Sequence, residues 1–468
     1  MKIGKAILLL LVAGFGAQLC AAKVYLRWTE GALPPAKVLG VNEIVIPWNE
    51  TASALLAETK KQGYEAYVEV GAAQIADAVN AAVRANAAGV ILRGEAAEER
   101  ALAEKAKEVR KAHPKLKVMV LDGHGKPPEM RGWIVFQKDG ILQVSSPTSQ
   151  PWLDTNLAAI RYQRVFEADT PLYSFAWDES DPLVKEFGPK PLDYELAIAE
   201  AGAYHADLVL PVHEAQQKGL TIGSKNALDD WARVKRYLQF YRMKDASGTA
   251  AAEARVCVLT EDFEATFEPL NLMARHNIPF RVMKSSGVQG KDLAECDVAI
   301  AFAEPGKELA AALNDFATKG GVAVLVKVQG PFAWESSGTG VNNGPSTTYT
   351  IGKGRVIELK EAVADPETFA QDVRRLMTKA NVPVNLWNSL TTLVAAYPGT
   401  KAGETIVELV NYDEESSEVQ VQVKGTFGSA SYETPEHGRS AKLNATHVNG
   451  FTQFVVPDLV VGGRVRLE

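Results

Sequence analysis

Cysteine and histidine are scarce in this chain of 468 residues, which contains three cysteines and seven histidines. The histidines are scattered, and neither an HExxH nor a CxxC motif occurs, so no spacing gathers metal ligands on one face of an element. We therefore expect no metal and no other cofactor. Two cysteines in a long chain do not make a disulfide framework. Cys257 lies in the apolar stretch ARVCVLT and is expected to be a small core residue.

Runs of basic residues are also absent. The chain has 50 Lys and Arg against 57 Asp and Glu, which gives a formal net charge of −7. Proteins that bind nucleic acid neutralise phosphates with clustered Lys and Arg. The composition therefore argues against nucleic acid as the main partner.

Long hydrophobic runs are missing beyond the N-terminus. Within residues 1–22, Lys2 and Lys5 precede a short apolar stretch that ends in small residues, which is the pattern of a cleaved signal peptide rather than of a membrane span. We expect no membrane span in the mature protein and a periplasmic or secreted location. Cys20 suggests the alternative of a lipoprotein, but Leu19 before it is a poor fit for lipoprotein processing.

Residues 23–245 alternate between strand-like and amphipathic helix-like stretches. Eight stretches have the strand pattern: 24–28, 43–48, 65–70, 89–93, 117–121, 141–145, 171–177 and 207–212. Strands that alternate with crossover helices in a segment of this length are typical of a (β/α)8 TIM barrel. The fifth helix is replaced by the polar stretch 122–140, and a long loop on a compact barrel is often functional.

Two further units follow the barrel. Residues 254–384 again alternate between strands and helices and predict a small doubly wound α/β domain, which lacks a glycine-rich phosphate loop and is therefore not expected to bind a nucleotide. A hairpin is expected over 349–359 and a helix over 366–380. Residues 385–468 show short alternating strands separated by turns, which predicts a C-terminal β-sandwich.

Four short segments accompany this order of parts: RGE at 93–95, FAWDE at 175–179, the strand at 297–303, and VELVNY at 407–412. With them, the chain resembles bacterial glycoside hydrolases of the trimeric β-galactosidase type and their uncharacterised relatives. The resemblance implies that the middle unit is a flavodoxin-like, glutamine amidotransferase-like domain that contributes to homo-oligomer contacts.

The sequence departs from that family at its key positions. Gly94 precedes Glu95 where the family has Asn-Glu, and Asp178 followed by Glu179 stands where the family has Glu. The middle unit has no cysteine at a sharp strand-to-helix turn, so glutaminase chemistry is not expected.

Glycoside hydrolysis needs two carboxyl groups on either side of the scissile bond, with different pKa values. Strands four and seven lie across a barrel from each other. We therefore predict Glu95 as the acid/base and Asp178 as the nucleophile, with Glu179 as the neighbouring candidate. A separation of about 5–5.5 Å would indicate a retaining enzyme, and about 6.5–9.5 Å an inverting one.

Residues near the same strand ends are predicted to bind a carbohydrate ligand. They are Trp48, Asn49, Glu50, Glu69, Arg93, His213 and Glu214. An indole, an amide and a carboxylate in sequence suit a sugar, and Trp28, Trp133, Trp152 and Trp177 are further candidates for stacking. A tryptophan on a barrel strand more often packs in the core, so that alternative stays open for each of them. A structural alternative stays open, because Arg93 can instead be neutralised by Glu69 and Glu95, and His213 with Glu214 can form an ion pair at the rim.

Three hypotheses follow. The first is an exported glycoside hydrolase that acts on an oligosaccharide or a polysaccharide fragment. The second is a catalytically inactive carbohydrate-binding or scaffold protein, which the missing Asn before Glu95 favours and which predicts mouth carboxylates paired with Arg27, Arg93 or lysines. The third is a surface-assembly protein that oligomerises through the α/β domain. Whether the protein is an enzyme is not decided by the sequence.

Overall fold

The structure is a computed structural model of the chain. The residues that it describes are 22–94, 98–121, 123–132, 135–138, 141–144, 151–166, 170–180, 182–242 and 251–468. The expected signal peptide, apart from its last residue, lies outside this part, and so does Glu95.

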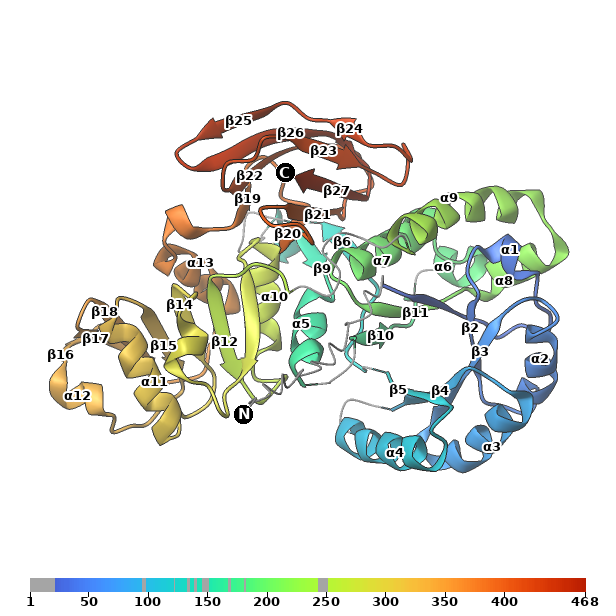
Figure 1. Cartoon of the computed structure of the whole chain (residues 1–468), viewed down its shortest axis with the longest axis horizontal. Helices are drawn as coiled ribbons and strands as arrows, with labels where there is room; N and C mark the ends of the chain where they lie inside the picture. Colours follow the sequence, from blue (N-terminus) through green and yellow to red (C-terminus); the bar gives the residue numbers. More distant parts are fainter. Residues whose placement is uncertain are drawn as a thin grey trace, which may run out of the picture.

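The N-terminal unit is a parallel barrel that is nearly closed (Figure 1). Its seven-stranded sheet has the order β10-β11-β1-β2-β3-β4-β5. The strands are β1 (Val24–Arg27), β2 (Glu43–Pro47), β3 (Glu65–Gly71), β4 (Gly89–Arg93), β5 (Lys117–Val120), β10 (Leu172–Ser174) and β11 (Asp207–Pro211). Each coincides with an expected strand, so the prediction of a TIM-type barrel is confirmed for seven of its strands.

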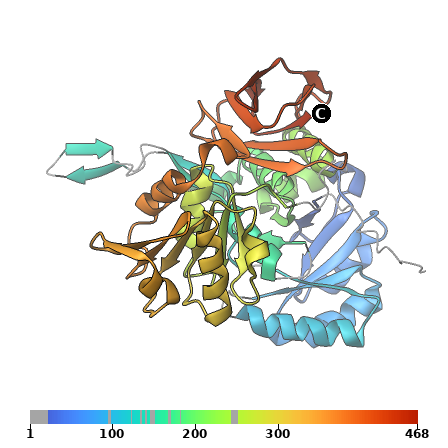
Figure 2. The same cartoon turned by 60° about the vertical axis from the view of Figure 1, so that its left-hand side comes forward.

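The prediction of the sixth barrel strand, at 141–145, is wrong. Residues Ile141–Val144 form β8, which pairs antiparallel with β7 (Val135–Lys138) outside the barrel sheet. Figure 2 shows this ribbon apart from the barrel. A parallel strand needs a long crossover, usually a helix, whereas Asp139 and Gly140 between β7 and β8 are a dipeptide that favours a two-residue hairpin. The polar stretch before β8 also contains β6 (Glu129–Gly132), which pairs with β9 (Trp152–Asp154).

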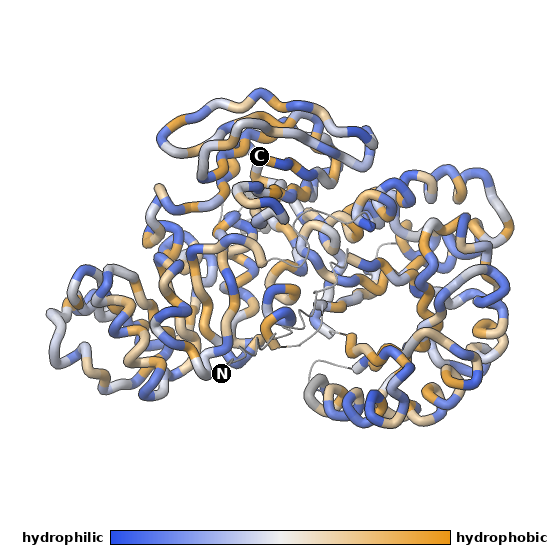
Figure 3. Tube along the Cα trace, viewed as in Figure 1, coloured by the Kyte–Doolittle hydropathy of each residue, from blue (hydrophilic) through white to orange (hydrophobic). Residues whose placement is uncertain are grey.

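Helices cover the outside of the barrel, and hydrophobic and hydrophilic stretches alternate along them (Figure 3). They are α1 (Ala36–Leu39), α2 (Ala52–Thr59), α3 (Ile75–Ala85), α4 (Glu99–Ala112), α5 (Leu157–Phe166), α6 (Pro182–Phe187), α7 (Pro191–Ala203), α8 (Glu214–Ile222) and α9 (Lys225–Arg242). Alternate strand side chains face the helices or the interior, and Tyr25, Val45, Tyr67, Ile91 and Val209 form the interior cluster. The next inward positions toward the carboxyl ends are free to carry polar groups.

The middle unit is a second seven-stranded sheet of order β13-β12-β14-β15-β18-β17-β16. Its strands are β12 (Val256–Thr260), β13 (Phe280–Lys284), β14 (Val298–Ala301), β15 (Val322–Val326), β16 (Thr339–Asn342), β17 (Ser346–Ile351) and β18 (Gly354–Leu359), with helices α10 (Phe267–Arg275), α11 (Lys307–Thr318), α12 (Ala333–Ser337) and α13 (Pro366–Leu376). The expected hairpin is present as β17 and β18. Its second strand also pairs in parallel with β15, which joins the hairpin to the parallel sheet.

Cys257 is fully buried in the core of the middle unit, as expected, but it is not a free thiol: it forms a disulfide with Cys296, with a Cα–Cα distance of 6.0 Å. The two cysteines are 39 residues apart in the sequence. They meet because β12 and β14 are neighbours in the sheet and Val256 pairs with Val298. Sequence spacing alone does not reveal this neighbourhood.

The C-terminal unit consists of two antiparallel sheets, β19-β22-β26-β25 and β20-β21-β27-β23-β24, which confirms the β-sandwich. The strands are β19 (Val384–Leu386), β20 (Thr392–Pro398), β21 (Thr405–Asn411), β22 (Ser417–Lys424), β23 (Ala430–Glu433), β24 (Ala441–Lys442), β25 (Ala445–Val448), β26 (Phe451–Leu459) and β27 (Gly462–Leu467). The sandwich sits over both preceding units (Figure 1).

Polar contacts attach the sandwich to both units. The hydroxyl of Tyr412 donates to the buried carboxylate of Glu200 on α7, and the Asn277 side chain exchanges hydrogen bonds with the backbone of Thr392 and Val394. In the described part of the chain, no helix has the length and apolar character that a bilayer span requires.

Candidate functional site

The carboxyl ends of β1, β3 and β4 bring three charged side chains together at the mouth of the barrel. The Arg27 Nε donates to Glu69 at 2.8 Å, and an Arg93 guanidinium nitrogen donates to its other oxygen at 2.9 Å. They follow the inward-facing Tyr25, Tyr67 and Ile91 by two residues. Strand pleating therefore places all three side chains above the apolar interior.

The Glu69 side chain is 6% exposed, whereas Arg27 and Arg93 are 26% and 41% exposed. One buried carboxylate thus orients two guanidinium groups that solvent reaches. Two positive charges against one negative charge leave an excess positive charge among these three groups. Guanidinium groups donate several hydrogen bonds in a fixed geometry, so the pair can hold a hydroxyl-rich or anionic ligand.

The sequence left open that Glu69 neutralises Arg93, and the structure contains this ion pair. Arg27 is a second partner of the same carboxylate. Both oxygens of the Glu69 carboxylate are engaged, because each accepts a hydrogen bond from one of the two arginines. Glu69 is therefore suited to positioning the arginines rather than to contacting a ligand itself.

Gly94 explains one departure from the glycoside hydrolase pattern. A Cβ atom at this position would lie 2.6 Å from the Leu102 side chain on α4 and 2.6 Å from Glu98. A larger residue such as asparagine here would require the ends of the Glu98 and Leu102 side chains to shift. Glu95, the predicted acid/base, lies outside the described residues, and so does its distance to Asp178.

Asp178 and Glu179 follow β10 in an exposed loop. The Ser180 hydroxyl and backbone N–H donate to the Asp178 carboxylate and lower its pKa, with the backbone bond at 2.9 Å. Asp178 is therefore ionised at neutral pH, as a nucleophile must be. The neighbouring aromatic residues face the helices as alternation predicts: Phe175 is buried, and Trp177 packs edge-on against Tyr194 of α7.

His213 and Glu214 have local structural partners. His213 caps α8, because its Nδ1 accepts from the backbone N–H of Ala215 at 3.3 Å. Glu214 pairs with Lys218 one turn later, and this hydrogen bond lowers the pKa of Glu214. The described ion pair of Glu214 is therefore with Lys218 in the same helix, whereas the sequence left open a rim pair with His213.

The segment after β2 is held mainly by its own contacts. Trp48 is half-buried and packs against the barrel core, while Asn49 accepts from the backbone and hydroxyl of Thr51 at 2.9 Å each. Glu50 is exposed. Trp28 is fully buried and its indole donates to the carbonyl of Ala32, so Trp28 packs in the core, the alternative that the sequence favoured for a tryptophan on a barrel strand. Trp133 lies outside the described residues.

Among the described residues, no group of three or more His, Cys, Asp or Glu side chains is arranged to hold a metal ion. The same part of the chain has no free thiol, because Cys257 and Cys296 are joined. Sequence reasoning named Arg27 only as a counter-charge. It also missed a pocket between the middle unit and the sandwich, because strands β19 and β25 that border it are too short to give a clear alternating pattern.

No family model matches this chain, and no curated protein matches it in sequence. Among solved structures, α-L-fucosidase isoenzyme 2 from Paenibacillus thiaminolyticus is similar over 96% of this chain and 99% of its own, with a TM-score of 0.61 and 11% identity. A rhamnosidase from Novosphingobium sp. PP1Y matches with a TM-score of 0.44, 12% identity, and coverage of 89% of this chain and 39% of its own. An exo-β-1,4-mannosidase from Opitutaceae bacterium strain TAV5 matches with a TM-score of 0.41, 10% identity, and coverage of 77% and 97%. The first of these matches shows that the chain shares the overall fold of that α-L-fucosidase structure, a TIM-type barrel joined to β-rich units.

Proposed function

We propose that this protein is an exported glycoside hydrolase that binds an oligosaccharide or a polysaccharide fragment at the barrel mouth. The observation that carries the proposal is the pair of partly exposed arginines, Arg27 and Arg93, held by the buried Glu69 at the carboxyl ends of three strands. Barrel enzymes place their active sites at this face. The similarity to an α-L-fucosidase over nearly the whole chain supports a sugar as the ligand.

In this proposal Asp178 is the nucleophile and Glu95 the acid/base. The lowered pKa of Asp178 supports the first role, because a nucleophilic carboxylate must be ionised before it attacks. Arg27 and Arg93 hold sugar hydroxyl or acidic groups. Glu179 and the remaining predicted binding residues, Trp48, Asn49, Glu50, His213 and Glu214, border the same face.

The experiment is a screen of the mature protein against 4-nitrophenyl glycosides, including an α-L-fucoside and a β-galactoside, with release of nitrophenol as the readout. We expect turnover of at least one glycoside and a loss of kcat of about 100-fold or more in Asp178→Asn. Glu179→Gln is the comparison, because Glu179 is the neighbouring candidate: if Asp178 is the nucleophile, Glu179→Gln should lose much less activity than Asp178→Asn. Equal activity of wild type and Asp178→Asn would contradict the assignment of the nucleophile.

The second candidate is a carbohydrate-binding protein without catalysis. It is favoured by the engagement of Glu69 with two arginines and by the close packing of Gly94 against α4. Under this candidate, wild type releases no nitrophenol from any glycoside but binds an oligosaccharide, and Arg93→Gln weakens that binding at least tenfold. Undiminished binding in Arg93→Gln would place the ligand elsewhere.

Export and assembly complete the proposal. The buried Cys257–Cys296 disulfide supports an oxidising compartment outside the cytoplasm. Cleavage before Lys23 predicts that N-terminal sequencing of the periplasmic or secreted protein begins at this residue. We further propose that the chain is related to trimeric-type β-galactosidases and that its middle unit is amidotransferase-like and forms homo-oligomer contacts. Light scattering of the purified protein tests the oligomer.

A further inference from the structure

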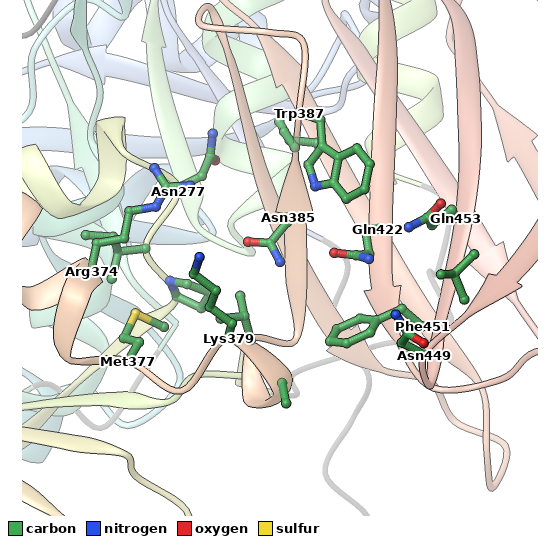
Figure 4. A pocket seen from close by; sticks show the side chains of 16 residues that line it. Asn277, Arg374, Met377, Lys379, Asn385, Trp387, Gln422, Asn449, Phe451 and Gln453 are labelled. Carbon is green, nitrogen blue, oxygen red and sulfur yellow. The ribbon is translucent and has the colours of Figure 1, made fainter.

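A pocket of about 570 Å³ lies between the middle unit and the β-sandwich. None of its lining residues belongs to the barrel unit. One wall comes from the end of α13 and the turn after it, with Arg374 and Lys379. The other comes from the sandwich, with Asn385, Trp387 and Gln422 (Figure 4). This volume is within the range of about 300–1,000 Å³ that is usual for ligand sites.

The sandwich wall carries a row of polar side chains that crosses the whole four-stranded sheet. In the strand register, Asn385 pairs with Gln422, Gln422 with Gln453, and Gln453 with Thr446. Paired residues of antiparallel strands point to the same face. With strands about 4.8 Å apart, the row extends over roughly 15 Å.

These side chains point outward and keep their hydrogen-bonding groups available. Their neighbours Val421 and Val423 on β22 are buried in the sandwich core. Within the part of the chain that the structure describes, the amides of Asn385, Gln422 and Gln453 make no hydrogen bond. Each amide offers both donors and an acceptor, as do the hydroxyl groups of a sugar.

Trp387 lies beside this row and is 60% exposed. Figure 4 shows its indole next to Asn385 and Gln422. A second cavity of about 210 Å³ adjoins the same indole and extends to Asn444 and Thr446. A large aromatic ring is costly to leave in water, and its flat apolar face fits the C–H face of a pyranose ring.

The positive charge of the pocket favours acidic saccharides over neutral ones. Arg374 and Lys379 are exposed on its wall, and no residue that lines the pocket is acidic. Within the described residues, neither cation has an ion-pair partner. Since the whole chain has a net charge of −7, this local excess of positive charge stands out from the overall composition.

We propose that this inter-domain pocket, together with the outer face of β19-β22-β26-β25, is a second saccharide site that binds an acidic oligosaccharide. Trp387 stacks on one sugar ring, and the amide row receives the hydroxyl groups of successive residues. Arg374 and Lys379 receive a carboxylate or sulfate group. The site is separate from the barrel mouth and does not depend on hydrolysis there.

The test is isothermal titration calorimetry of the full mature chain with three probes: an oligogalacturonate, its methyl ester, and a sulfated galacto-oligosaccharide. We expect one of the two acidic probes to bind at least tenfold more tightly than the neutral ester, and which one it is identifies the acidic group. Added salt should weaken the binding of that probe.

Variants locate the binding. Trp387→Ala should reduce the affinity for the acidic probe at least tenfold, and Gln422→Ala at least threefold. Phe187→Ala, which removes another exposed aromatic ring, on α6, should not change this affinity. The double variant Arg374→Gln/Lys379→Gln should abolish the preference for the acidic probe. Arg93→Gln at the barrel mouth should leave this binding unchanged, which separates the site from the proposed active site.

Two results would overturn the proposal. One is no binding of either acidic probe at millimolar concentration by a wild-type chain that unfolds cooperatively. The other is binding that Trp387→Ala and Gln422→Ala leave intact while both variants keep the thermal unfolding midpoint of wild type.

Discussion

Cys257 on β12 and Cys296 before β14 are joined by a disulfide that closes a long segment of the middle unit. The Arg281 side chain donates to the Cys257 sulfur at 3.1 Å and to the carbonyl of Asp292 at 2.8 Å. One cation therefore connects β13, the disulfide and the turn before β14. Together, the disulfide and the Arg281 contacts hold β12 and β14 side by side in the sheet.

The first prediction concerns this disulfide. Replacing both cysteines with alanine should lower the free energy of unfolding of the middle unit by about 4 kcal/mol, since the closed loop of 39 residues restricts the unfolded chain. Urea titration of the oxidised wild type and of the double variant measures the difference. Equal midpoints, or two free thiols in the folded wild type by mass spectrometry, would contradict the prediction.

A second prediction concerns Glu69. Glu69→Gln should lower the free energy of unfolding by about 1–3 kcal/mol, because two guanidinium groups lose their carboxylate while the site stays partly buried. It should also raise KM or Kd for a saccharide more than it lowers kcat, because Arg27 and Arg93 lose their orientation. Glu214→Gln is the control, since this exposed carboxylate pairs with Lys218 one turn along α8, and it should leave stability unchanged. If Glu69→Gln kept the stability and the saccharide affinity of wild type, Glu69 would not be needed to position Arg27 and Arg93, and the prediction would be wrong.

Tyr412 supports a third prediction, on the attachment of the sandwich. Its hydroxyl donates to Glu200, which also accepts from Asn156 and Thr155. Burial raises the pKa of Glu200, so each donor matters to the carboxylate. Tyr412→Phe should cost about 2 kcal/mol and should uncouple the unfolding of the sandwich from that of the barrel.

Tyr397→Phe is the matched comparison for Tyr412→Phe. The Tyr397 hydroxyl donates to the neutral carbonyl of Ala203 at 2.8 Å, so its removal should lower the free energy of unfolding by about 1 kcal/mol. Differential scanning calorimetry measures both variants. A larger effect of Tyr397→Phe than of Tyr412→Phe would contradict the importance of the Glu200 network.

A fourth prediction concerns pH and Asp207, at the amino-terminal end of β11. Burial raises the pKa of Asp207 to about 6, although it accepts from the backbone N–H of Lys23 at 2.8 Å. A raised pKa means that the folded state holds the proton more tightly than the unfolded state. The stabilisation is therefore complete below about pH 4, where the unfolded chain also titrates, and is lost as pH rises to about 6.

The loss amounts to about 3 kcal/mol for a shift of about two pKa units. Urea titrations between pH 4 and 7.5, on a form that retains residues before Lys23, should show this decline in wild type. Asp207→Asn should remove it while keeping an acceptor for the Lys23 N–H. An unchanged pH dependence in Asp207→Asn would contradict the prediction.

Removal of the residues before Lys23 should alter the same profile. The nitrogen that donates to Asp207 would then be a charged terminal amine instead of an amide, and an adjacent positive charge lowers the pKa of a carboxyl. We expect the form that begins at Lys23 to keep its stability to pH 7.5. Identical pH profiles of the two forms would show that the terminal amine does not reach Asp207.

Local patterns predicted most elements of the fold. The barrel strands, the β17–β18 hairpin, α13 and the main sandwich strands all follow from apolar periodicity and turn residues. The error at 141–145 arose because a short apolar run does not reveal which strand it will pair with. The sequence of Ile141–Val144 suits a buried parallel strand or a hairpin equally. Its antiparallel pairing with β7 places it outside the barrel sheet.

The candidate site was predictable only in part. Strand ends and alternation placed Glu69 and Arg93 at the barrel mouth, but not the position of Arg27 against the same carboxylate, which requires β1 and β3 to curve around β2. The pocket at Trp387 was not predictable, because its walls are contributed by α13 and β22, which only inter-domain packing brings together.

The sequence by itself determined which residues form strands and helices and which side chains face inward, because these follow from contacts over a few residues. Only the tertiary structure decided that Cys257 meets Cys296, that Glu69 holds two arginines, and that an amide row lies opposite Arg374 and Lys379. These relationships depend on which distant strands become neighbours, and that choice is made by burial of the whole core.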